Sequence, residues 1–444
     1  MKHCTELDFG PYGGAELFFA DIDGDGQIEI LAYQGPGVFG ATPYRSWPQV
    51  APVLPRSTCL SAFRRDGTRL WSFGEPNPTD RPYAAHAFEA CVSVGDIDGD
   101  GTPTVALADG SRLLLLDGPS GALRTAASLA ADNLYIVGML GQPSAPGEAV
   151  LAAKNGEGGS GPWRYGEPVL GFDRDLRPVW GPVAIPGGGH YILGVDLDRR
   201  GRHDFLIGYC RVTPAGQWTC LVEGLDPARV DAATAHVDYT EVLPIGRTQC
   251  LVGFAGSDKA YLVGPRRRTR FVRPDTHVQG CAVGRFRPDS RFQMMIYNDD
   301  GPLLLVDAAG RELWRLPTTP LEQWPLGQPE CCRGRVFHRN RPIVRWPGRP
   351  DRVVFSDGGW PWVIDGDGLV TRCFEPPETA RQPEQTLPEQ ARADDMGFGF
   401  ATQIVDWTGD GTPHAVIYDR RRLWVFPPPE TTQARSRKVL RTRA

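Results

Sequence analysis

Lysine is scarce in this sequence. Only four of the 48 cationic residues are lysines, and of these only Lys154 and Lys259 lie away from the two ends of the chain. The formal net charge of -5 is small for 444 residues, so the chain lacks the strongly basic character that binding to a nucleic-acid backbone requires. We therefore expect no nucleic-acid partner, and the two internal lysines become candidates for specific roles.

Long apolar runs are also missing. No stretch approaches the roughly 18 consecutive apolar residues that indicate a membrane-spanning helix. The N-terminus lacks the charged, apolar and small-residue segments of a secretory signal. These absences predict that the chain neither spans a membrane nor carries a visible export signal.

Several catalytic and metal-binding motifs are absent. The ten cysteines include no CxxC pair, which argues against a zinc ribbon or a thioredoxin-type site. There is also no GxSxG, P-loop or HExxH motif. Cysteines inside apolar runs are most simply buried thiols, whereas Cys210 and Cys220 flank a short hairpin-like loop and are the best disulfide candidates.

Glycine and proline, in contrast, are abundant. With 53 Gly and 41 Pro they make up about a fifth of the chain, against roughly 12% in average proteins. This excess excludes long helical bundles. An ordinary α/β chain of this length would divide into roughly two or three domains, but a repeat architecture would remove that need.

One pattern recurs along the whole chain. It consists of an apolar strand, an acidic or polar loop, a second strand, a turn, a third strand, an Asp-Gly turn and a fourth strand, and its clearest copy spans residues 91–126. Four short apolar runs separated by Gly, Asp and Pro predict a four-stranded antiparallel meander. The other copies span residues 16–33, 134–154, 191–209, 239–263, 281–316, 342–368 and 402–426.

Eight such sheets in a ring make a β-propeller, which protects most sheet edges. We therefore predict an all-β fold, with a single β-propeller of four-stranded antiparallel blades over residues 1–430. Eight blades are favoured, and seven are the alternative if one unit is misread. A short strand near residues 5–9 is expected to close the ring by completing the last unit, and residues 431–444 are predicted to be a disordered basic tail.

The loop between the first two strands of the first unit has the order DxDGDGxxE. Oxygen ligands at alternate positions of such a loop wrap a hard cation, and glycine permits the tight turn. We therefore predict a Ca²⁺ site whose simplest role is to hold the turn between two strands. Its ligands are Asp21, Asp23, Asp25, Gln27 and Glu29.

Three other loops repeat part of this motif. In the fourth unit, Asp196, Asp198 and Asp204 remain but Arg200 takes the fifth position, where we expect its charge to replace the ion. The two predicted metal loops are Asp96, Asp98, Asp100 and Thr102 in the second unit, and Asp406, Thr408 and Asp410 in the last.

Antiparallel order places the residues before the first strand and after the second strand of every unit on one face, opposite these loops. The residues at those positions are rich in His and Tyr and include both internal lysines. Any single one, such as His236, is explained equally well as a structural turn residue. The candidate site residues are His86, His190, Tyr209, Lys154, Arg211, His277 and Asp109, with Trp47, Arg164 and Tyr165 on two long insertions.

This residue set suits the removal of a proton next to a carboxylate. A cation or Ca²⁺ holds the acid group, a neutral His or Tyr takes the α-proton, and a second group protonates the leaving oxygen. A glycoside hydrolase would instead need two carboxylates about 5 to 10 Å apart. On this face Asp109, Asp258 and Glu89 give no convincing pair.

The segment AHAFEACVSVGDIDGDGTPTVALADG at residues 85–110 resembles the family 11 rhamnogalacturonan lyases, in which a His precedes the strand and ADG follows it. The segment LSAFRRDGTRLWSF at residues 60–73 is similar to the AYxxDGTxLW blade ending of those enzymes. The calcium motif more widely resembles FG-GAP/VCBS-type propellers. Ulvan lyases and rhamnose–glucuronate lyases share the calcium propeller and a His/Tyr/Arg site.

The resemblance implies a Ca²⁺-containing polysaccharide lyase that cleaves a uronate-containing, rhamnose-linked polysaccharide by β-elimination. His86 and His190 are then expected to be the base and the acid, with Tyr209 as an alternative acid, and Lys154 and Arg211 to bind the carboxylate. The resemblance also implies an extracellular or periplasmic protein, and we expect a monomer with an acidic polysaccharide as its partner. The alternative is a non-catalytic, calcium-stabilised propeller that binds glycan or protein.

Overall fold

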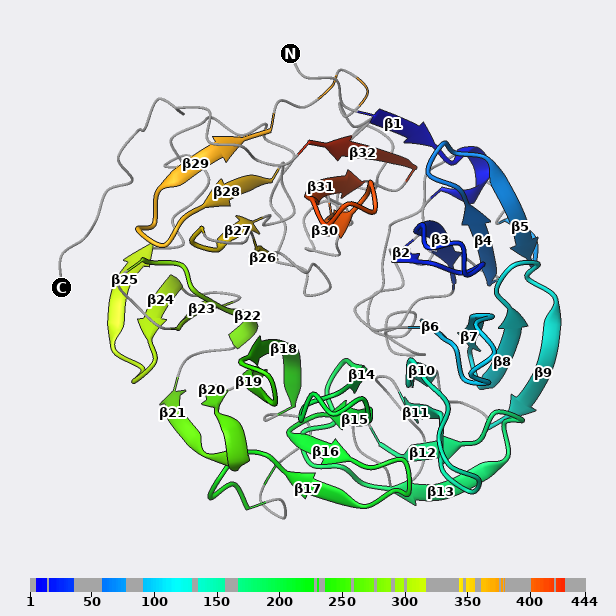
Figure 1. The fold of residues 1–444 in the computed structure, drawn as a ribbon, viewed down its shortest axis with the longest axis horizontal. Coiled ribbons are helices and arrows are strands. Elements are labelled where there is room, and N and C mark those ends of the chain that lie inside the picture. Colours follow the sequence, from blue (N-terminus) through cyan, green and yellow to red (C-terminus); the bar gives the residue numbers. More distant parts are fainter. Residues whose placement is uncertain are drawn as a thin grey trace, which may run out of the picture.

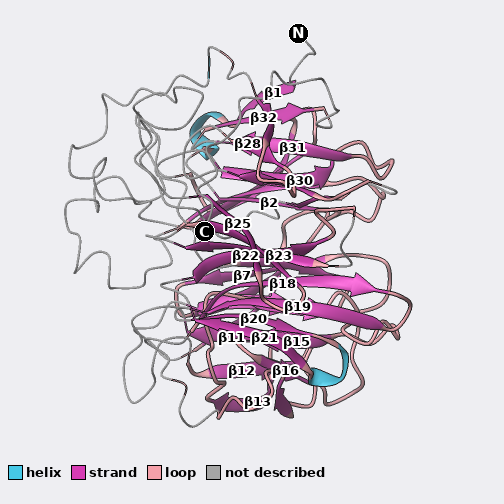
Figure 2. Cartoon of the chain, turned by 90° about the vertical axis from the view of Figure 1, so that its left-hand side faces the viewer, coloured by secondary structure: helices cyan, strands magenta, loops and turns pink. Residues whose placement is uncertain are grey.

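The repeated pattern of the sequence forms eight separate sheets, each of four antiparallel strands. In the computed structural model these sheets stand as blades around a common axis, in chain order (Figure 1). Seen from the side, the strands run across the thickness of the ring, so their loops emerge at its two ends (Figure 2). The all-β prediction and the propeller architecture are therefore confirmed.

The described part of the chain runs from residue 5 to residue 427 with several gaps. No helix within it is long and apolar enough to cross a membrane. The predicted tail at 431–444 lies outside it. The structure describes residues 5–13, 16–35, 58–76, 91–129, 135–155, 167–226, 230, 236–256, 259–274, 278–288, 292–298, 302–316, 343–345, 349–355, 361–374, 377, 379, 401–418 and 421–427.

Blades are numbered here in chain order. Blade 1 contains β2 (Glu16–Ala20), β3 (Glu29–Gln34), β4 (Cys59–Phe63) and β5 (Arg69–Phe73). Blade 2 contains β6 (Val92–Gly95), β7 (Thr104–Asp109), β8 (Arg112–Asp117) and β9 (Leu123–Ser128). Blade 3 contains β10 (Tyr135–Met139), β11 (Leu151–Asn155), β12 (Val169–Phe172) and β13 (Pro178–Val183). Blade 4 contains β14 (Ile192–Val195), β15 (Asp204–Ile207), β16 (Cys210–Val212) and β17 (Trp218–Cys220).

The second half of the ring repeats this order. Blade 5 contains β18 (Val237–Ile245), β19 (Gln249–Gly256), β20 (Lys259–Val263) and β21 (Thr269–Pro274). Blade 6 contains β22 (Val278–Gly284), β23 (Gln293–Asn298), β24 (Leu303–Asp307) and β25 (Glu312–Leu316). Blade 7 contains β26 (Ile343–Val344), β27 (Arg352–Phe355), β28 (Trp362–Ile364) and β29 (Val370–Cys373). Blade 8 contains β30 (Ala401–Asp406), β31 (Pro413–Tyr418), β32 (Arg422–Phe426) and, as its outermost strand, β1 (Thr5–Asp8).

The N-terminal strand closes the ring, as the sequence predicts. β1 pairs antiparallel with β32, with Thr5 opposite Val425 and Asp8 opposite Arg422. Arg421 Nε also donates to Asp8 Oδ1 at 2.8 Å. One sheet therefore joins the two ends of the chain, which fastens the ring where it would otherwise be open.

The second strands form the core of the blades because both of their faces are covered by neighbouring sheets. Every side chain of β15 and of β3 is buried, and β7 is buried except at its last residue. This burial on both faces explains why the second strands read as continuous apolar runs rather than as alternating patterns.

Tryptophans within three of the fourth strands join their blades to the next. Trp71 Nε1 donates to Gly118 O of blade 2 at 2.8 Å, and Trp180 Nε1 donates to Pro214 O of blade 4 at 3.0 Å. Trp314 Nε1 makes the same bond to Gly366 O of blade 7 at 2.9 Å. The acceptors all lie in the turn between the third and fourth strands, so the contact is repeated around the ring.

The glycines of these turns make room for the indole rings. A Cβ added to Gly121, which has a φ of +68°, would lie 2.5 Å from the Trp71 ring. A Cβ at Gly216, with a φ of +81°, would lie equally close to Trp180. At these two positions the turns thus need glycine both for a left-handed backbone and for close packing.

We expect Trp71→Phe to lower the free energy of unfolding by about 1 to 2 kcal/mol, because the buried Gly118 carbonyl loses its donor. Gly121→Ala should be more costly, because it adds both a steric clash and backbone strain. Gly147→Ala is the matched control, since Gly147 has a φ of +83° with nothing within 4 Å of an added Cβ. Thermal unfolding followed by circular dichroism measures the difference, and equal losses in the two glycine variants would contradict the packing role.

Candidate functional site

The register of the blades defines two ends of the ring. In blade 4, Ile192 pairs with Ile207 and Val195 pairs with Asp204. Residues just before β14 and just after β15 therefore lie at one end, and the loop between these strands lies at the other. We call the first end the His face, because it carries His190, and the second the loop face.

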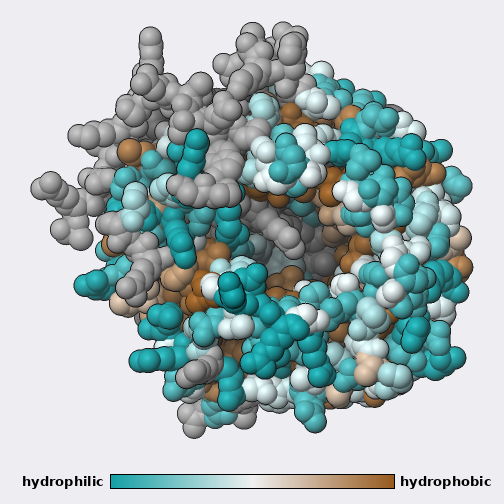
Figure 3. Space-filling view, viewed as in Figure 1, coloured by the Kyte–Doolittle hydropathy of each residue, from teal (hydrophilic) through white to brown (hydrophobic). Residues whose placement is uncertain are grey.

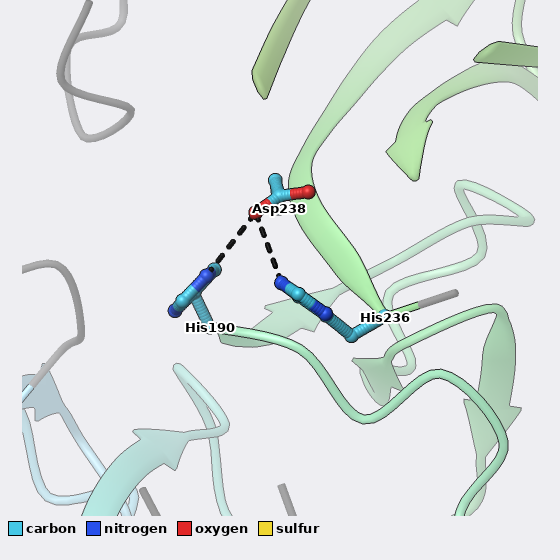
Figure 4. Close-up of side chains that lie close together, drawn as sticks. All are labelled: His190, His236 and Asp238. Atoms are coloured by element: carbon cyan, nitrogen blue, oxygen red, sulfur yellow. Dashed lines mark hydrogen bonds and ion pairs between the residues drawn. The ribbon is translucent and has the colours of Figure 1, made fainter. Parts of the chain in front are cut away.

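Three polar side chains meet on the His face. Asp238 Oδ1 lies 3.2 Å from His190 Nε2 and 3.1 Å from His236 Nε2 (Figure 4). The two imidazole rings are 5.2 Å apart and nearly perpendicular. Asp238 is 1% exposed and His190 is 9% exposed. We call these three residues the His–Asp cluster.

The cluster spans two blades, and the local sequence explains how. His236 and Asp238 flank Val237 at the start of β18, so both can point away from the buried valine side chain. The pairing of β18 with β19 shifts in register between Val237 and Tyr239. This irregularity leaves Asp238 outside the regular ladder, where its side chain can face the histidines.

A glycine-rich segment brings His190 to the neighbouring blade. Val237 N donates to Gly187 O at 3.1 Å, and His190 N donates to Val237 O at 3.2 Å. Gly189 has a φ of +58°, and a Cβ there would lie 1.9 Å from Val237 O. Only glycine permits this approach, so the GGG sequence before His190 positions the imidazole.

Asp238 is held in its ionised form. Burial acts to raise its pKa, but the hydrogen bonds with His190 and His236 and the charges of these rings lower the pKa below its ordinary value. A carboxylate between two imidazoles can fix the orientation of both rings. The same three ligand atoms lie within 4.8 Å of one another, so this cluster can also hold a divalent cation.

Lys154 joins this site from a third blade. Its side chain is fully buried on β11, and Nζ donates to the carbonyl of Gly189, next to His190. Blades 3, 4 and 5 thus converge at one point, as the sequence predicts for Lys154 and His190. The ammonium group supports the glycine segment that carries His190 and places a positive charge beside it.

A cavity lies along the ring axis near the cluster. It has a volume of about 560 Å³ and is lined by the first strands of five blades, with Tyr191 and Tyr239 among the lining residues. These tyrosines follow His190 and Asp238 in sequence, and their rings lie 6.0 Å apart. Figure 3 shows the ring hollowed at its centre, with hydrophobic residues bordering the hollow.

Arg211 does not lie at this site, which corrects the sequence-based prediction. Its guanidinium forms ion pairs with Asp198 at 2.9 Å and with Asp204, whose Oδ2 accepts from Nε at 2.5 Å. Asp204 pairs with Val195 at the loop face, whereas His190 precedes Ile192 at the other end. The long side chain therefore extends from β16 away from the His face.

The position of Arg211 also corrects the prediction that the charge of Arg200 replaces the ion in the blade 4 loop. Arg200 contributes its backbone N–H to Asp196 Oδ1 at 3.0 Å, while its side chain is exposed. The guanidinium of Arg211 instead connects the third and ninth positions of the loop, Asp198 and Asp204. The ion is thus replaced by a charge from the third strand, which the spacing of the loop alone cannot reveal.

Tyr209 packs against blade 5, and Asp109 makes polar contacts within blade 2 and with blade 1. The Tyr209 ring is 1% exposed and packs edge-on against Phe254 and Tyr261 of blade 5 at 5.4 and 5.3 Å. Asp109 accepts from Thr58 Oγ1 at 2.6 Å and pairs with Arg112.

Other predicted site residues lie outside the described residues. They are His86, His277, Trp47, Arg164 and Tyr165, together with Glu89 and Asp258.

The acidic loop of blade 1 has the geometry of a cation site. Asp21 accepts backbone bonds from Gly24 at 2.7 Å and Gly26 at 2.9 Å, and carboxylate oxygens of Asp21, Asp23 and Glu29 lie within 4.8 Å of one another. Glu29 is 3% exposed. Burial raises its pKa, the N–H of Ile22 opposes this, and the nearby aspartates raise the pKa further. A divalent cation would relieve this repulsion, so these residues fit one.

The predicted loop of blade 2 has the same backbone hydrogen bonds as the blade 1 loop, but its carboxylates are paired differently. Asp96 accepts from Gly99 at 2.7 Å and Gly101 at 3.0 Å, and Asp100 accepts from the Thr102 N–H at 2.8 Å. However, Asp98 pairs with Arg124 at 2.5 Å, and Arg124 also donates to Thr104. A guanidinium again connects the third and ninth positions.

The predicted loop of blade 8 is an intermediate case. Asp406 accepts from Gly409 at 2.9 Å and Gly411 at 2.8 Å, and Thr408 Oγ1 donates to Asp410 at 2.8 Å. The ninth position is His414 rather than a carboxylate. Among these three predicted loops, only that of blade 1 keeps carboxylates at positions one, three, five and nine.

Sequence reasoning missed Asp238 and left the role of His236 open. The signal for both is the His-x-Asp spacing at the start of an apolar strand run, which places two polar side chains on the same side of a strand. A glycine-rich segment ending in His190 lies one blade earlier in the sequence. Together these two features indicate a shared site once adjacent blades are known to be neighbours.

Comparisons with known proteins support the fold. No protein-family model matches the sequence, and no curated protein is a detectable relative. The exotype rhamnogalacturonan lyase YesX matches 96% of this chain and 73% of its own, with a TM-score of 0.60 at 14% identity. The rhamnogalacturonan lyase PL11 of Bacillus licheniformis matches 97% and 73%, with a TM-score of 0.56 at 14% identity.

A protein that does not carry the name of a lyase is nearly as similar. BamB from Moraxella catarrhalis matches 95% of this chain and 98% of its own, with a TM-score of 0.51 at 12% identity. At these identities the likeness shows the fold alone. The chain is a β-propeller whose structural neighbours include rhamnogalacturonan lyases, and its function depends on its own site.

We expect Arg211→Ala to lower the free energy of unfolding by about 3 kcal/mol, because it leaves the buried Asp204 carboxylate without its partner. Arg211→Lys should lower the free energy of unfolding by less, since it keeps the positive charge but loses the planar set of N–H donors of the guanidinium. Arg200→Ala is the control and should change stability by less than about 0.5 kcal/mol. Denaturant titration gives the three values, and an equal loss for Arg200→Ala would restore Arg200 as the residue that replaces the ion.

Proposed function

We propose that this protein is a polysaccharide lyase that cleaves a uronate-containing, rhamnose-linked polysaccharide by β-elimination, leaving an unsaturated uronate end. The observation that carries the proposal is the His–Asp cluster, in which an ionised carboxylate orients two imidazoles where three blades converge. The fold likeness to rhamnogalacturonan lyases supports it. That the chain belongs with these propeller lyases is part of the same proposal.

We assign proton transfer to His190. With its Nε2–H directed at Asp238, the Nδ1 atom of His190 becomes the proton acceptor. His236 shares the same carboxylate oxygen and restricts the cluster to one arrangement. The buried ammonium of Lys154, held by Gly189, adds positive charge beside the base and favours an anionic substrate.

A divalent cation at the His–Asp cluster would bind the uronate carboxylate and stabilise the charge that develops as the α-proton leaves. The role of the three side chains would then be to hold it, and the proton acceptor would come from elsewhere on the His face. His86, predicted as the second acid or base, remains a candidate for that role. Adding metal ions to chelated protein separates the two assignments.

We propose that the partner is an acidic polysaccharide and that the protein acts as a monomer in an extracellular or periplasmic setting, where such polymers occur. Neither nucleic acid nor a membrane is proposed as a partner. The alternative is a propeller that binds glycan or protein at the same face without cleaving it.

The lyase proposal predicts a rise in the ultraviolet absorbance of unsaturated uronate when the protein is incubated with rhamnogalacturonan, ulvan or gum arabic. His190→Ala and Asp238→Asn should lower the rate by about 10²- to 10⁴-fold, the range expected for loss of general acid–base catalysis. His203→Ala is the control, because His203 lies on the loop face and should leave the rate unchanged.

Two results would contradict the proposal that the protein is a lyase. One is the absence of any absorbance rise with the three polymers in the presence of Ca²⁺. The other is a wild-type rate in both His190→Ala and Asp238→Asn. If the wild-type protein binds a polymer without cleaving it, the alternative of a glycan-binding propeller replaces the lyase.

We further propose that the blade 1 loop binds Ca²⁺ and stabilises the fold. A chelator should then lower the thermal unfolding midpoint of the wild-type protein, because a ligand that binds only the folded state adds to its stability. Glu29→Gln should abolish this chelator effect. Asp98→Asn is the matched control: Arg124 already holds Asp98, so the chelator effect should persist. A chelator effect unchanged in Glu29→Gln would contradict the site.

A further inference from the structure

Two cysteines face each other across the outer hairpin of blade 4. Cys210 of β16 pairs directly with Cys220 of β17. On either side of them, Leu221 N donates to Tyr209 O at 2.9 Å and Thr213 N donates to Gln217 O at 2.8 Å. Since hydrogen-bonded and non-hydrogen-bonded pairs alternate along an antiparallel ladder, Cys210 and Cys220 form a non-hydrogen-bonded pair.

This register suits a disulfide without backbone movement. The Cα atoms of a non-hydrogen-bonded pair lie about 4.5 Å apart, with their side chains at the closest approach in the ladder. Disulfides span Cα separations of about 4.4 to 6.8 Å. Both cysteines are free thiols in this structure, so the pair is a reduced form of a bridge that the backbone already permits.

The two thiols differ in their chemistry. The hydrogen bond from Cys210 lowers the pKa of Cys220 to about 7; burial acts in the opposite direction, and the positive charge of Arg267 lowers the pKa further. The same hydrogen bond and burial raise the pKa of Cys210. Cys220 is therefore the thiol that ionises first, and the thiolate is the nucleophile in disulfide exchange.

The pair is accessible from one side only. Cys210 is fully buried, whereas Cys220 is half-buried. Thr219 and Leu221, which flank Cys220, line a cavity of about 630 Å³ together with Arg267. Because successive side chains of a strand point to opposite faces, Cys220 faces away from this cavity, and a small reagent reaches it through its own half-buried surface while Cys210 remains shielded.

We propose that Cys210 and Cys220 form a redox site in which a low-molecular-weight disulfide oxidises the thiol pair to an intramolecular disulfide. The Cys220 thiolate attacks one sulfur of the reagent, which releases one thiolate and leaves a mixed disulfide. Cys210 then loses its proton and attacks Cys220 Sγ, which releases the second thiolate. Two protein thiols are oxidised and one reagent disulfide is reduced to two thiols.

The bridge would fasten a short part of the sheet. β16 and β17 share only three paired positions, and Cys210 and Cys220 are at one end of them. The same strand, β16, carries Arg211, whose ion pairs hold the loop of blade 4. Oxidation would therefore reinforce the outer hairpin of the blade that also positions His190.

The test uses wild-type protein equilibrated with reduced or oxidised glutathione, blocked with N-ethylmaleimide and digested with trypsin under non-reducing conditions. Trypsin cleaves after Arg211, so it separates the two cysteines into peptides 203–211 and 212–229. We expect these peptides to be joined after oxidation and to separate on reduction. The joined species should be absent from Cys220→Ser and present in Cys250→Ser, a control variant of a buried free thiol in the next blade.

Thermal unfolding gives a second measurement that does not depend on digestion. Oxidation should raise the unfolding midpoint of the wild-type protein by a few degrees. The midpoint of the double variant that combines Cys210→Ser with Cys220→Ser should not change on oxidation. The proposal is overturned if oxidised wild-type protein yields only separate, blocked peptides. It is also overturned if glutathione stays attached to Cys220, or if Cys220 joins Cys250 instead. None of these results depends on lyase activity.

Discussion

Three blade boundaries depend on the contact between a tryptophan in the fourth strand of one blade and the turn of the next. A four-stranded sheet that is apolar on both faces must be covered by two neighbours, so no blade is complete alone. Trp71, Trp180 and Trp314 each pack an indole ring against the following blade and donate the N–H to a turn carbonyl there. This hydrogen bond fixes the position of one sheet relative to the next, where apolar contact alone would allow sliding.

Fixed angles between blades make a site built from separate blades feasible. Lys154, His190 and Asp238 come from blades 3, 4 and 5, and the bond from Lys154 to Gly189 and that between His190 and Asp238 both cross a blade boundary. Inter-blade packing sets where the strands lie, and the glycine segment before His190 covers the remaining distance. Placement of the imidazole therefore follows from the same packing that closes the ring.

The sequence predicts features that depend on local order and misses those that depend on side-chain reach. The eight units, the closing strand and the face of His190 and Lys154 follow from strand periodicity and antiparallel order, which are local properties. Arg211 was placed on the wrong face because register locates its backbone, whereas its guanidinium extends along the sheet to Asp204. Asp238 escaped notice because an irregularity in β18 sets its orientation.

The loops between the first and second strands share one backbone arrangement but differ in how their charged side chains are paired. In blades 1, 2 and 8 the first aspartate accepts N–H groups from the fourth and sixth positions, so the turn is held before any ion is considered. What differs is how the remaining polar groups are satisfied. Blade 1 leaves three carboxylates facing one another, and blades 2 and 4 insert an arginine from another strand. In blade 6 the neutral Gln293 accepts the Phe286 N–H at 2.8 Å, as Glu29 accepts that of Ile22 at 3.0 Å. Among these loops, the carboxylate set that fits a cation is therefore a property of blade 1 and not of the shared backbone.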